Sequence, residues 1–338
     1  MQAQEPLEEI RLKHELPALG AVAVVDGKPQ AVLVVGTRKF GGTEPALATD
    51  AFHLGSDTKA MTAALIGLLV DQGKLGWKTT LGEVIAETPL AWKATTIEAL
   101  LAHQAGLTKL EPRGKSLLYL HGFTGPLEKQ RSRWLTERLE NAPDKTVGEF
   151  AYSNAGYTLL GMIAERVAGK PWERLIVENL WKPLNITGGG FGAPPLMWQH
   201  RLQSKKLQPL APSLLADNPP LMGPAGVAHL PLGEWAKFVA VFADPEHQTL
   251  LKPETLTWLS TPSRGGDYNG GWMITARPWA GGTALTHGGS NTFNFCVAWV
   301  APQKRFAALV ATTVAGDDAT QACDAVVGML IRRFLKPG

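Results

Sequence analysis

Strand-like segments lie near both ends of this 338-residue chain, with helical patterns between them. Apolar, β-branched runs at 19–25 and 31–35 flank the turn sequence Asp-Gly-Lys-Pro, which predicts a hairpin. Strand character returns at 272–276, 293–300 and 306–313. If these runs share one sheet, the two ends of the chain must meet in it, and the middle of the chain must be an insertion.

The middle of the chain is dominated by helical spacing of apolar residues, joined by loops rich in Pro and Gly. A long proline-rich segment separates the last two helices of this stretch, and such a connection is usually functional or wraps a surface. The predicted helices are 56–71, 96–103, 132–139, 155–168, 172–180 and 232–243, with a last helix whose apolar face spans 322–334.

These patterns predict an α/β plus all-α protein. An antiparallel sheet flanked by helices would be built from residues 1–73 and 265–338, and a mainly helical lobe, residues 74–264, would be inserted into it. A small-molecule site is expected in the cleft between the two lobes.

Charge and cysteine usage exclude several classes of function. Lys and Arg total 33 against 30 Asp and Glu, and like charges occur only in short pairs, so neither nucleic acid nor an acidic membrane surface is an expected partner. Cys296 and Cys323 lack metal-binding spacing, and no HExxH motif is present, so neither a metal nor a cofactor is expected. The two cysteines are expected to be buried and unpaired, with a disulfide between them as the alternative.

No stretch of the sequence approaches the ~20 apolar residues of a membrane span, and the N-terminus has no apolar signal-peptide core. Two compartments remain as expectations. The protein is periplasmic or secreted with its signal removed, or else it is cytoplasmic.

The most informative local pattern is Ser56 followed by Lys59 at the start of the predicted helix 56–71. Residues i and i+3 share a helix face, so the lysine amine can reach the serine hydroxyl. A serine needs a base to take its proton, and a lysine desolvated in a cleft can have a pKa low enough to act as that base. The positive end of the helix also favours negative charge beside Ser56. Taken alone, the pair is more typical of a helix N-cap followed by a solvated lysine.

Two further segments place polar side chains in loops. Tyr152 and Asn154 precede the predicted helix 155–168 and are free to project into a cleft. A nearby ammonium would help Tyr152 to lose or share its proton, and an asparagine offers both donor and acceptor to a substrate amide. The alternative is that Asn154 only caps a helix and Tyr152 only packs. The segment His-Gly-Gly-Ser-Asn at 287–291 lies at a predicted strand entry, where glycines permit close approach of backbone to a ligand.

The order and separation of these segments resemble the serine β-lactamase and penicillin-binding-protein superfamily, in the branch that holds class C β-lactamases, DD-carboxypeptidases and family VIII esterases. The resemblance covers about 19–335. It includes Leu-Leu-Ala-His-Gln-Ala-Gly-Leu at 100–107, which is similar to the family's Leu-Leu-x-His-x-x-Gly-Leu, together with Pro-Leu at 183–184, Gly-Pro-Ala-Gly at 223–226 and Gly-Gly-Trp at 270–272. It implies a β-lactamase/transpeptidase-like fold.

For the site, the resemblance implies that Ser56 is acylated while Lys59 and Tyr152 share the duties of general base and general acid. It implies that Asn154 binds the substrate's amide. It also implies that the backbone N–H groups of Ser56 and Ser290 form the oxyanion hole, a device often worth ~3 kcal/mol or more per donor.

The motif at 287–289 departs from the family pattern, which is commonly Lys-Thr-Gly or His-Thr-Gly. The resemblance places His287 beside the leaving group and Gly289 in the same substrate-binding motif, but Gly288 lacks the hydroxyl that helps to hold a substrate carboxylate. A histidine is also largely neutral at pH 7. Two contacts that favour anionic substrates are therefore absent or weakened. Residues that could compensate are Ser290, Asn291 and Arg277.

The expected activity is that of a serine hydrolase acting through an acyl-enzyme on a small-molecule or short-peptide substrate, namely a β-lactam, an ester or a D-Ala-type amide. A class C-like β-lactamase with some capacity for ester hydrolysis is the leading expectation. The alternatives are a DD-carboxypeptidase, a family VIII carboxylesterase and a non-catalytic penicillin-binding sensor that is acylated without turnover. An α/β-hydrolase is excluded, because Leu54 stands where its Gly-x-Ser-x-Gly elbow needs a glycine.

Overall fold

The computed structural model describes residues 4–107, 117–204, 206–263 and 265–335. Its main sheet has eight strands in the order β2-β1-β13-β12-β11-β10-β9, and β3 also pairs with β1. Every pairing in this sheet is antiparallel. The strands are β1 (Ala18–Val25), β2 (Lys28–Pro29), β3 (Leu33–Gly36), β9 (Tyr268–Asn269), β10 (Trp272–Arg277), β11 (Gly282–Gly289), β12 (Phe295–Ala301) and β13 (Phe306–Thr312).

The two ends of the chain meet in this sheet, as predicted. Strand β1 pairs with β13 from Leu19 opposite Thr312 to Val25 opposite Phe306. Both strands are almost entirely buried, which explains why they read as continuous apolar runs rather than as alternating ones.

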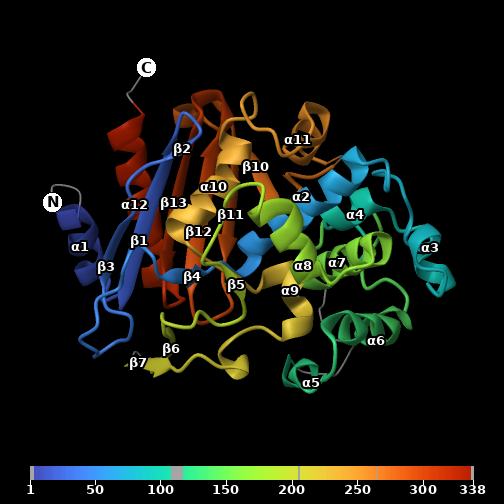
Figure 1. Ribbon diagram of the computed structural model, residues 1–338, viewed down its shortest axis with the longest axis horizontal. Coiled ribbons are helices and arrows are strands. Elements are labelled where there is room, and N and C mark those ends of the chain that lie inside the picture. Colours follow the sequence, from blue (N-terminus) through green and yellow to red (C-terminus); the bar gives the residue numbers. More distant parts are fainter. Residues whose placement is uncertain (1–3, 108–116, 205, 264, 336–338) are drawn as a thin grey trace.

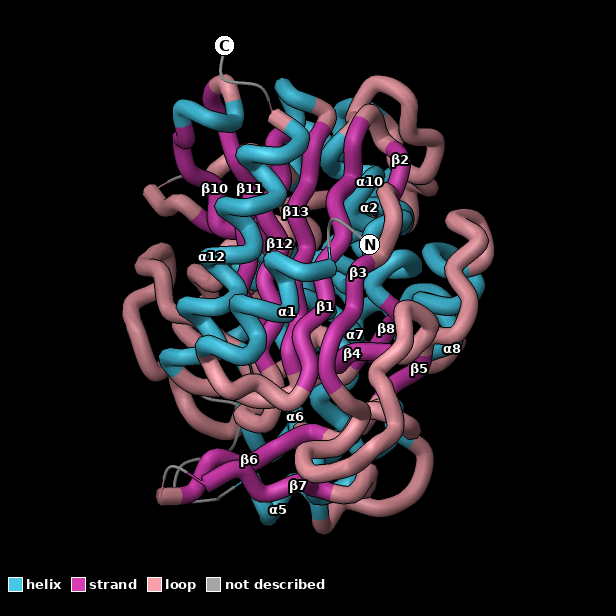
Figure 2. Tube along the Cα trace, turned by 90° about the vertical axis from the view of Figure 1, so that its left-hand side faces the viewer, coloured by secondary structure: helices cyan, strands magenta, loops and turns pink. Residues whose placement is uncertain are grey.

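Helices cover both faces of the sheet. Helices α1 (Gln4–Lys13) and α12 (Asp317–Phe334) lie on one face, in front of the strands in Figure 2 and at the left in Figure 1. Helix α10 (Leu232–Ala243) packs on the other face, against β1 and β13. Alternate residues of β13 serve the two cores, with Ala308 and Val310 on the side of α12 and Leu309 and Ala311 on the side of α10. The predicted antiparallel sheet flanked by helices is therefore confirmed.

Beyond α10 lies a mainly helical region, at the right in Figure 1. Helix α2 (Thr58–Asp71) is buried on nearly all sides and packs against α7, α9 and α11. The other helices are α3 (Leu81–Val84), α4 (Ile97–Leu101), α5 (Leu117–His121), α6 (Leu127–Leu139), α7 (Asn154–Ala168), α8 (Trp172–Ile176), α9 (Gly223–Gly226) and α11 (Pro253–Leu259).

The proline-rich segment before α10 contains strands that the sequence patterns did not predict. Strands β5 (Gly190–Phe191) and β8 (Ala228–Pro231) form a small sheet with β4 (Ala51–His53), and β6 (Gln199–Gln203) pairs with β7 (Lys206–Leu210). Strands of two to five residues are too short to show a period of two. Helix α1 was not predicted either. The division of the chain at 73/74 and 264/265 stays a prediction.

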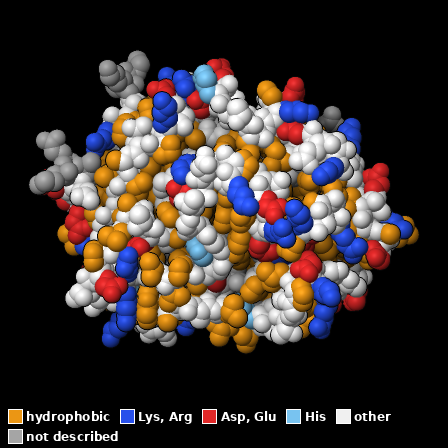
Figure 3. Space-filling model, viewed as in Figure 1, with side chains coloured by type: hydrophobic (Ala, Val, Ile, Leu, Met, Phe, Trp, Pro, Cys, Tyr) orange, Lys and Arg blue, Asp and Glu red, His pale blue; other side chains and the backbone are white. Residues whose placement is uncertain are grey.

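The surface and the thiols add three observations. Basic and acidic side chains are interspersed over the face shown in Figure 3. Cys296 and Cys323 are buried and unpaired, so the alternative of a disulfide is wrong. Within the described ranges, no helix is long and apolar enough to cross a bilayer.

Candidate active site

Ser56 lies in a single 3₁₀ turn, Gly55–Asp57, that leads directly into α2. One turn further on, Lys59 is fully buried. Its Nζ lies 3.1 Å from Ser56 Oγ, and it donates hydrogen bonds to Asn154 Oδ1 at 2.7 Å and to the Ala225 carbonyl at 2.8 Å. The predicted i, i+3 contact is therefore present. The alternative of a solvated lysine is wrong.

Burial governs the charge state of this lysine. Removal from water lowers the pKa of Lys59 well below its ordinary value, against a smaller opposing effect of Asp57. Burial likewise raises the pKa of the Asp57 carboxyl, whose Oδ2 accepts a hydrogen bond from Cys296 Sγ at 3.1 Å. Both shifts favour neutral groups. A neutral Lys59 amine has the lone pair needed to accept the Ser56 proton.

Tyr152 faces the same pair from the loop before α7. Its hydroxyl is hydrogen-bonded to Ser56, and Lys59 Nζ lies 4.8 Å from the centre of its ring. Desolvation raises the pKa of the phenol, against the opposing effect of the hydrogen bond to Ser56. This is the opposite of the shift expected from a neighbouring ammonium, because desolvation, which favours the neutral phenol, is the largest effect. Tyr152 therefore holds its proton and can donate it.

The loop that carries Tyr152 is held from two sides. Ser153, not Asn154, is the N-cap of α7, because the Ser153 side chain accepts a hydrogen bond from the Gly156 N–H at 3.1 Å. The view that Asn154 is only a helix cap is wrong, and its side chain is available to Lys59. His103 accepts the Ser153 N–H at its Nδ1 at 3.1 Å, and its ring centre lies 4.4 Å from that of Tyr152.

His103 belongs to the 100–107 motif, which the sequence analysis noted without assigning it a role. Its backbone is left-handed, with φ of 57°, and its carbonyl accepts the Ala151 N–H at 2.8 Å. The centre of its ring also lies 5.1 Å from that of Tyr157 and 4.6 Å from that of Tyr268. We conclude that this motif supports the Tyr152 loop.

The residues His287, Gly288 and Gly289 end strand β11 rather than beginning a strand. His287 is buried, with Nδ1 3.7 Å from Asp57 Oδ1. Burial is the largest cause that lowers the pKa of His287 to about 3, against the opposing effect of a hydrogen bond to the Gly288 backbone, so the ring is neutral near pH 7. Gly289 packs directly on the nucleophile turn, and a β-carbon there would come 2.2 Å from the Leu54 carbonyl oxygen.

Ser290 follows at the start of the next loop, and its backbone lies against Gly55. A β-carbon on Gly55, whose φ is 47°, would come 2.4 Å from the Ser290 nitrogen. An oxyanion hole made of the Ser56 and Ser290 N–H groups needs this proximity.

The side chains suggested as carboxylate ligands have partners within the protein. Ser290 Oγ donates to the Asn294 carbonyl, Asn291 Nδ2 donates to Gln199 Oε1, and Arg277 Nη1 donates to Thr275 Oγ1.

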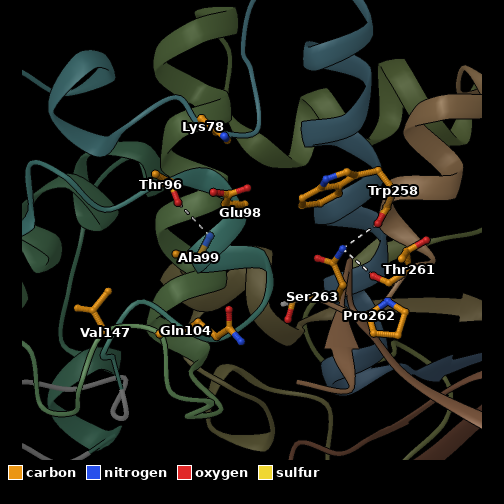
Figure 4. Close-up of a pocket in the computed structure, with 12 residues that line it drawn as sticks. Lys78, Thr96, Glu98, Ala99, Gln104, Val147, Trp258, Thr261, Pro262 and Ser263 are labelled. Carbon is orange, nitrogen blue, oxygen red and sulfur yellow. Dashed lines mark hydrogen bonds between the residues drawn. The ribbon is translucent and has the colours of Figure 1, made fainter. Parts of the chain in front are cut away.

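A cavity of about 690 Å³, within the size range of ligand pockets, is lined in part by Gln104, the residue that follows His103. Figure 4 shows Trp258 and Glu98 facing each other across the cavity, with Gln104 and Ser263 below them. Neither Ser56 nor Tyr152 lines it. Within the described ranges, no group of three or more His, Cys, Asp or Glu side chains is arranged to hold a metal.

A helix-flanked antiparallel sheet, with a serine and a buried lysine one turn apart and a tyrosine facing both, is the arrangement expected of the serine hydrolase family that the motifs resemble. The sequence pattern of the family described as Beta-lactamase matches residues 4–327. The chain belongs to the beta-lactamase family, which confirms the resemblance noted from its motifs.

Two curated relatives are similar in sequence to part of the chain, and one solved structure shares its fold. The chain is 29% identical over 192 residues to penicillin-binding protein 4 of Amycolatopsis lactamdurans, covering 54% of this chain and 47% of that protein. It is 32% identical over 180 residues to the esterase/beta-lactamase LipL of Mycobacterium tuberculosis, covering 52% and 39%. The chain thus spans less than half the length of either relative. The octameric penicillin-binding protein homologue from Pyrococcus abyssi shares the fold with a TM-score of 0.78 and 20% identity, over 98% of this chain and 79% of that one.

Proposed function

We propose that this protein is a serine hydrolase that forms an acyl-Ser56 intermediate and then hydrolyses it. The observation that carries the proposal is the 3.1 Å contact between Ser56 Oγ and the Nζ of the fully buried Lys59. Burial favours the neutral amine, and a neutral amine within hydrogen-bond reach of a hydroxyl is a competent general base.

In the first half of the reaction, Ser56 Oγ attacks the substrate carbonyl carbon while its proton passes to Lys59 Nζ. The negative charge that develops on the carbonyl oxygen is stabilised by the N–H groups of Ser56 and Ser290. When the bond to the leaving group breaks, Tyr152 gives its proton to the departing oxygen or nitrogen, and the proton held by Lys59 passes to the tyrosinate to restore the phenol. The products are the released amine or alcohol and acyl-Ser56.

In the second half, a water molecule attacks the ester carbonyl of acyl-Ser56. Its proton is taken by the Lys59 and Tyr152 pair and returned to Ser56 Oγ as the acyl group leaves as a carboxylic acid. The Asn154 side chain, held by Lys59 at 2.7 Å, lies where it can bind the substrate's amide or ester oxygen.

The charge of the site supports a preference for neutral esters over anionic β-lactams. His287 occupies the position where a cation would attract a carboxylate, but its pKa of about 3 keeps it neutral. Gly288 supplies no hydroxyl. We therefore propose ester hydrolysis as the faster activity and β-lactam hydrolysis as the slower one, with cleavage of D-Ala-type amides as the second candidate. The names of the two relatives, which combine esterase, beta-lactamase and penicillin binding, agree with a shared acylation step.

The test combines labelling with a substrate panel. A fluorophosphonate should modify the peptide that contains Ser56, and Ser56→Ala should abolish labelling, whereas Ser290→Ala, the nearby control, should still be labelled. A modified Ser153 or Ser290 would contradict the assignment. Steady-state rates on a short-chain aryl ester, a chromogenic cephalosporin and a D-Ala-D-Ala peptide rank the three activities. A stoichiometric burst without turnover on all three substrates would instead indicate a sensor.

A further inference from the structure

A group of buried polar side chains lies behind the nucleophile turn, and the proposed reaction uses none of them. Each is at least nine-tenths buried, and together they come from three separate parts of the chain. They are His53, Gln199, Asp217, Asn291 and Asn294.

His53 connects the turn to a carboxylate. Its Nδ1 accepts the Gly55 N–H at 2.9 Å, and its Nε2 lies 2.7 Å from Asp217 Oδ1. A neutral imidazole that accepts at one nitrogen carries its proton on the other. The Nε2 that carries the proton therefore lies next to the Asp217 carboxylate, in a close contact that is not aligned as a hydrogen bond, and this placement favours the tautomer that can hold Gly55.

Asp217 connects the same histidine to the loop that carries Ser290. Its Oδ1 also accepts a hydrogen bond from Asn291 Nδ2 at 2.9 Å. The Asn291 N–H in turn donates to Asn294 Oδ1 at 3.1 Å, and Asn294 Nδ2 donates to the His53 carbonyl at 2.6 Å. These contacts close a ring that passes through His53, Asp217, Asn291 and Asn294, which we call the polar ring.

The polar ring holds two backbone segments of positive φ next to each other. Gly55 has φ of 47°, which a glycine adopts readily, and Thr292 has φ of 79°, which is a strained value for a β-branched residue. The strained conformation of Thr292 persists only where the surroundings impose it. The Ser290 nitrogen lies against Gly55, so the polar ring spans both amides of the proposed oxyanion hole.

We propose that His53 and Asp217 are positioning residues that set the separation of the Ser56 and Ser290 N–H groups. This inference rests on the proposed function, because it concerns the same reaction. Charge develops on the substrate oxygen only in the transition state, so a misplaced amide lowers the acylation rate with little change in KM.

The experiment compares variants that break the polar ring with variants that keep it. Asp217→Ala removes the acceptor, whereas Asp217→Asn keeps an oxygen that can accept from His53 and Asn291. A displacement of about 1 Å costs roughly 10²-fold in rate, so Asp217→Ala should lower the pre-steady-state acylation rate on p-nitrophenyl acetate by about 10- to 100-fold. Asp217→Asn should stay within about threefold of the wild type, and KM should change little in either variant.

Asp244→Ala is the matched control for loss of stability. Asp244 is equally buried, and its carboxylate is paired with Arg305 away from the nucleophile turn. A second pair of variants covers the case in which Asp217→Ala does not fold. His53→Asn keeps an oxygen near the place of Nδ1 and should retain more acylation than His53→Leu.

The outcomes separate the two proposals. A wild-type protein no more active than Ser56→Ala would overturn the proposed function itself. With an active wild type, the positioning inference is overturned if Asp217→Ala acylates as fast as Asp244→Ala at equal thermal stability. It is also overturned if Asp217→Asn is as slow as Asp217→Ala, or if His53→Asn is as slow as His53→Leu.

Discussion

Replacing Gly289 by alanine should separate strand β11 from the nucleophile turn. The added β-carbon would come 2.2 Å from the Leu54 carbonyl oxygen and 3.1 Å from the Asp57 nitrogen. Both are backbone atoms, so no side chain can swing aside to relieve the clash. To reach ordinary van der Waals contact, the two segments must move apart by roughly 1 Å.

The size of the effect follows from this displacement. Ser290 comes directly after Gly289, so its N–H moves with the end of the strand. A misplacement of about 1 Å costs roughly 10²-fold in rate, which corresponds to ~2.7 kcal/mol of activation free energy. Overpacking should also lower the free energy of unfolding by about 1–3 kcal/mol. KM for a small ester should change little, because the oxyanion forms only in the transition state.

Gly288→Ala is the control for this prediction. It adds the same methyl group one residue earlier, where the nearest atom would be 3.5 Å away on the Phe295 ring. Both variants are assayed for kcat on an aryl ester and for thermal unfolding. A folded Gly289→Ala protein whose kcat is within about threefold of that of Gly288→Ala would refute the argument.

Three further predictions concern the same site. Lys59→Ala and Tyr152→Phe should each lower kcat by at least ~10²-fold. Because the two groups move one proton, the loss of kcat in the double variant should be much smaller than the product of the two single losses. Fully additive losses in activation free energy would contradict a joint role. Gly288→Thr should raise kcat/KM for a carboxylate-bearing β-lactam, relative to kcat/KM for a neutral ester, by roughly 10- to 100-fold. Gly288→Val, which has the shape of threonine without the hydroxyl, should not raise this ratio. An equal ratio in the two variants would place carboxylate recognition elsewhere. Because the folded pKa of His287, about 3, lies below the unfolded value of about 6.5, the native protein binds fewer protons and loses stability as pH falls through that window. Urea unfolding at about pH 7 and about pH 4.5 should therefore show a smaller acid loss for His287→Phe, and an unchanged loss would show that His287 is not responsible.

The parts of the site that depend on local geometry could be predicted from the sequence. Ser56 and Lys59 meet because helical residues three apart share a face, whatever surrounds the helix. Strands β1 and β13 were predictable because they are covered on both faces and so carry uninterrupted apolar runs. The order of the motifs along the chain was enough to indicate the family.

Only the tertiary structure decided the environment of those residues. The pKa of Lys59 depends on its complete removal from water, and the difference between Gly288 and Gly289 depends on which of them faces the Leu54 carbonyl. His53 and Asp217 lie far apart in the sequence and belong to no recognisable motif, yet they are in contact behind the nucleophile turn. A local pattern encodes the direction of a side chain relative to its own helix or strand. Desolvation and contacts between distant segments arise only when the whole chain packs.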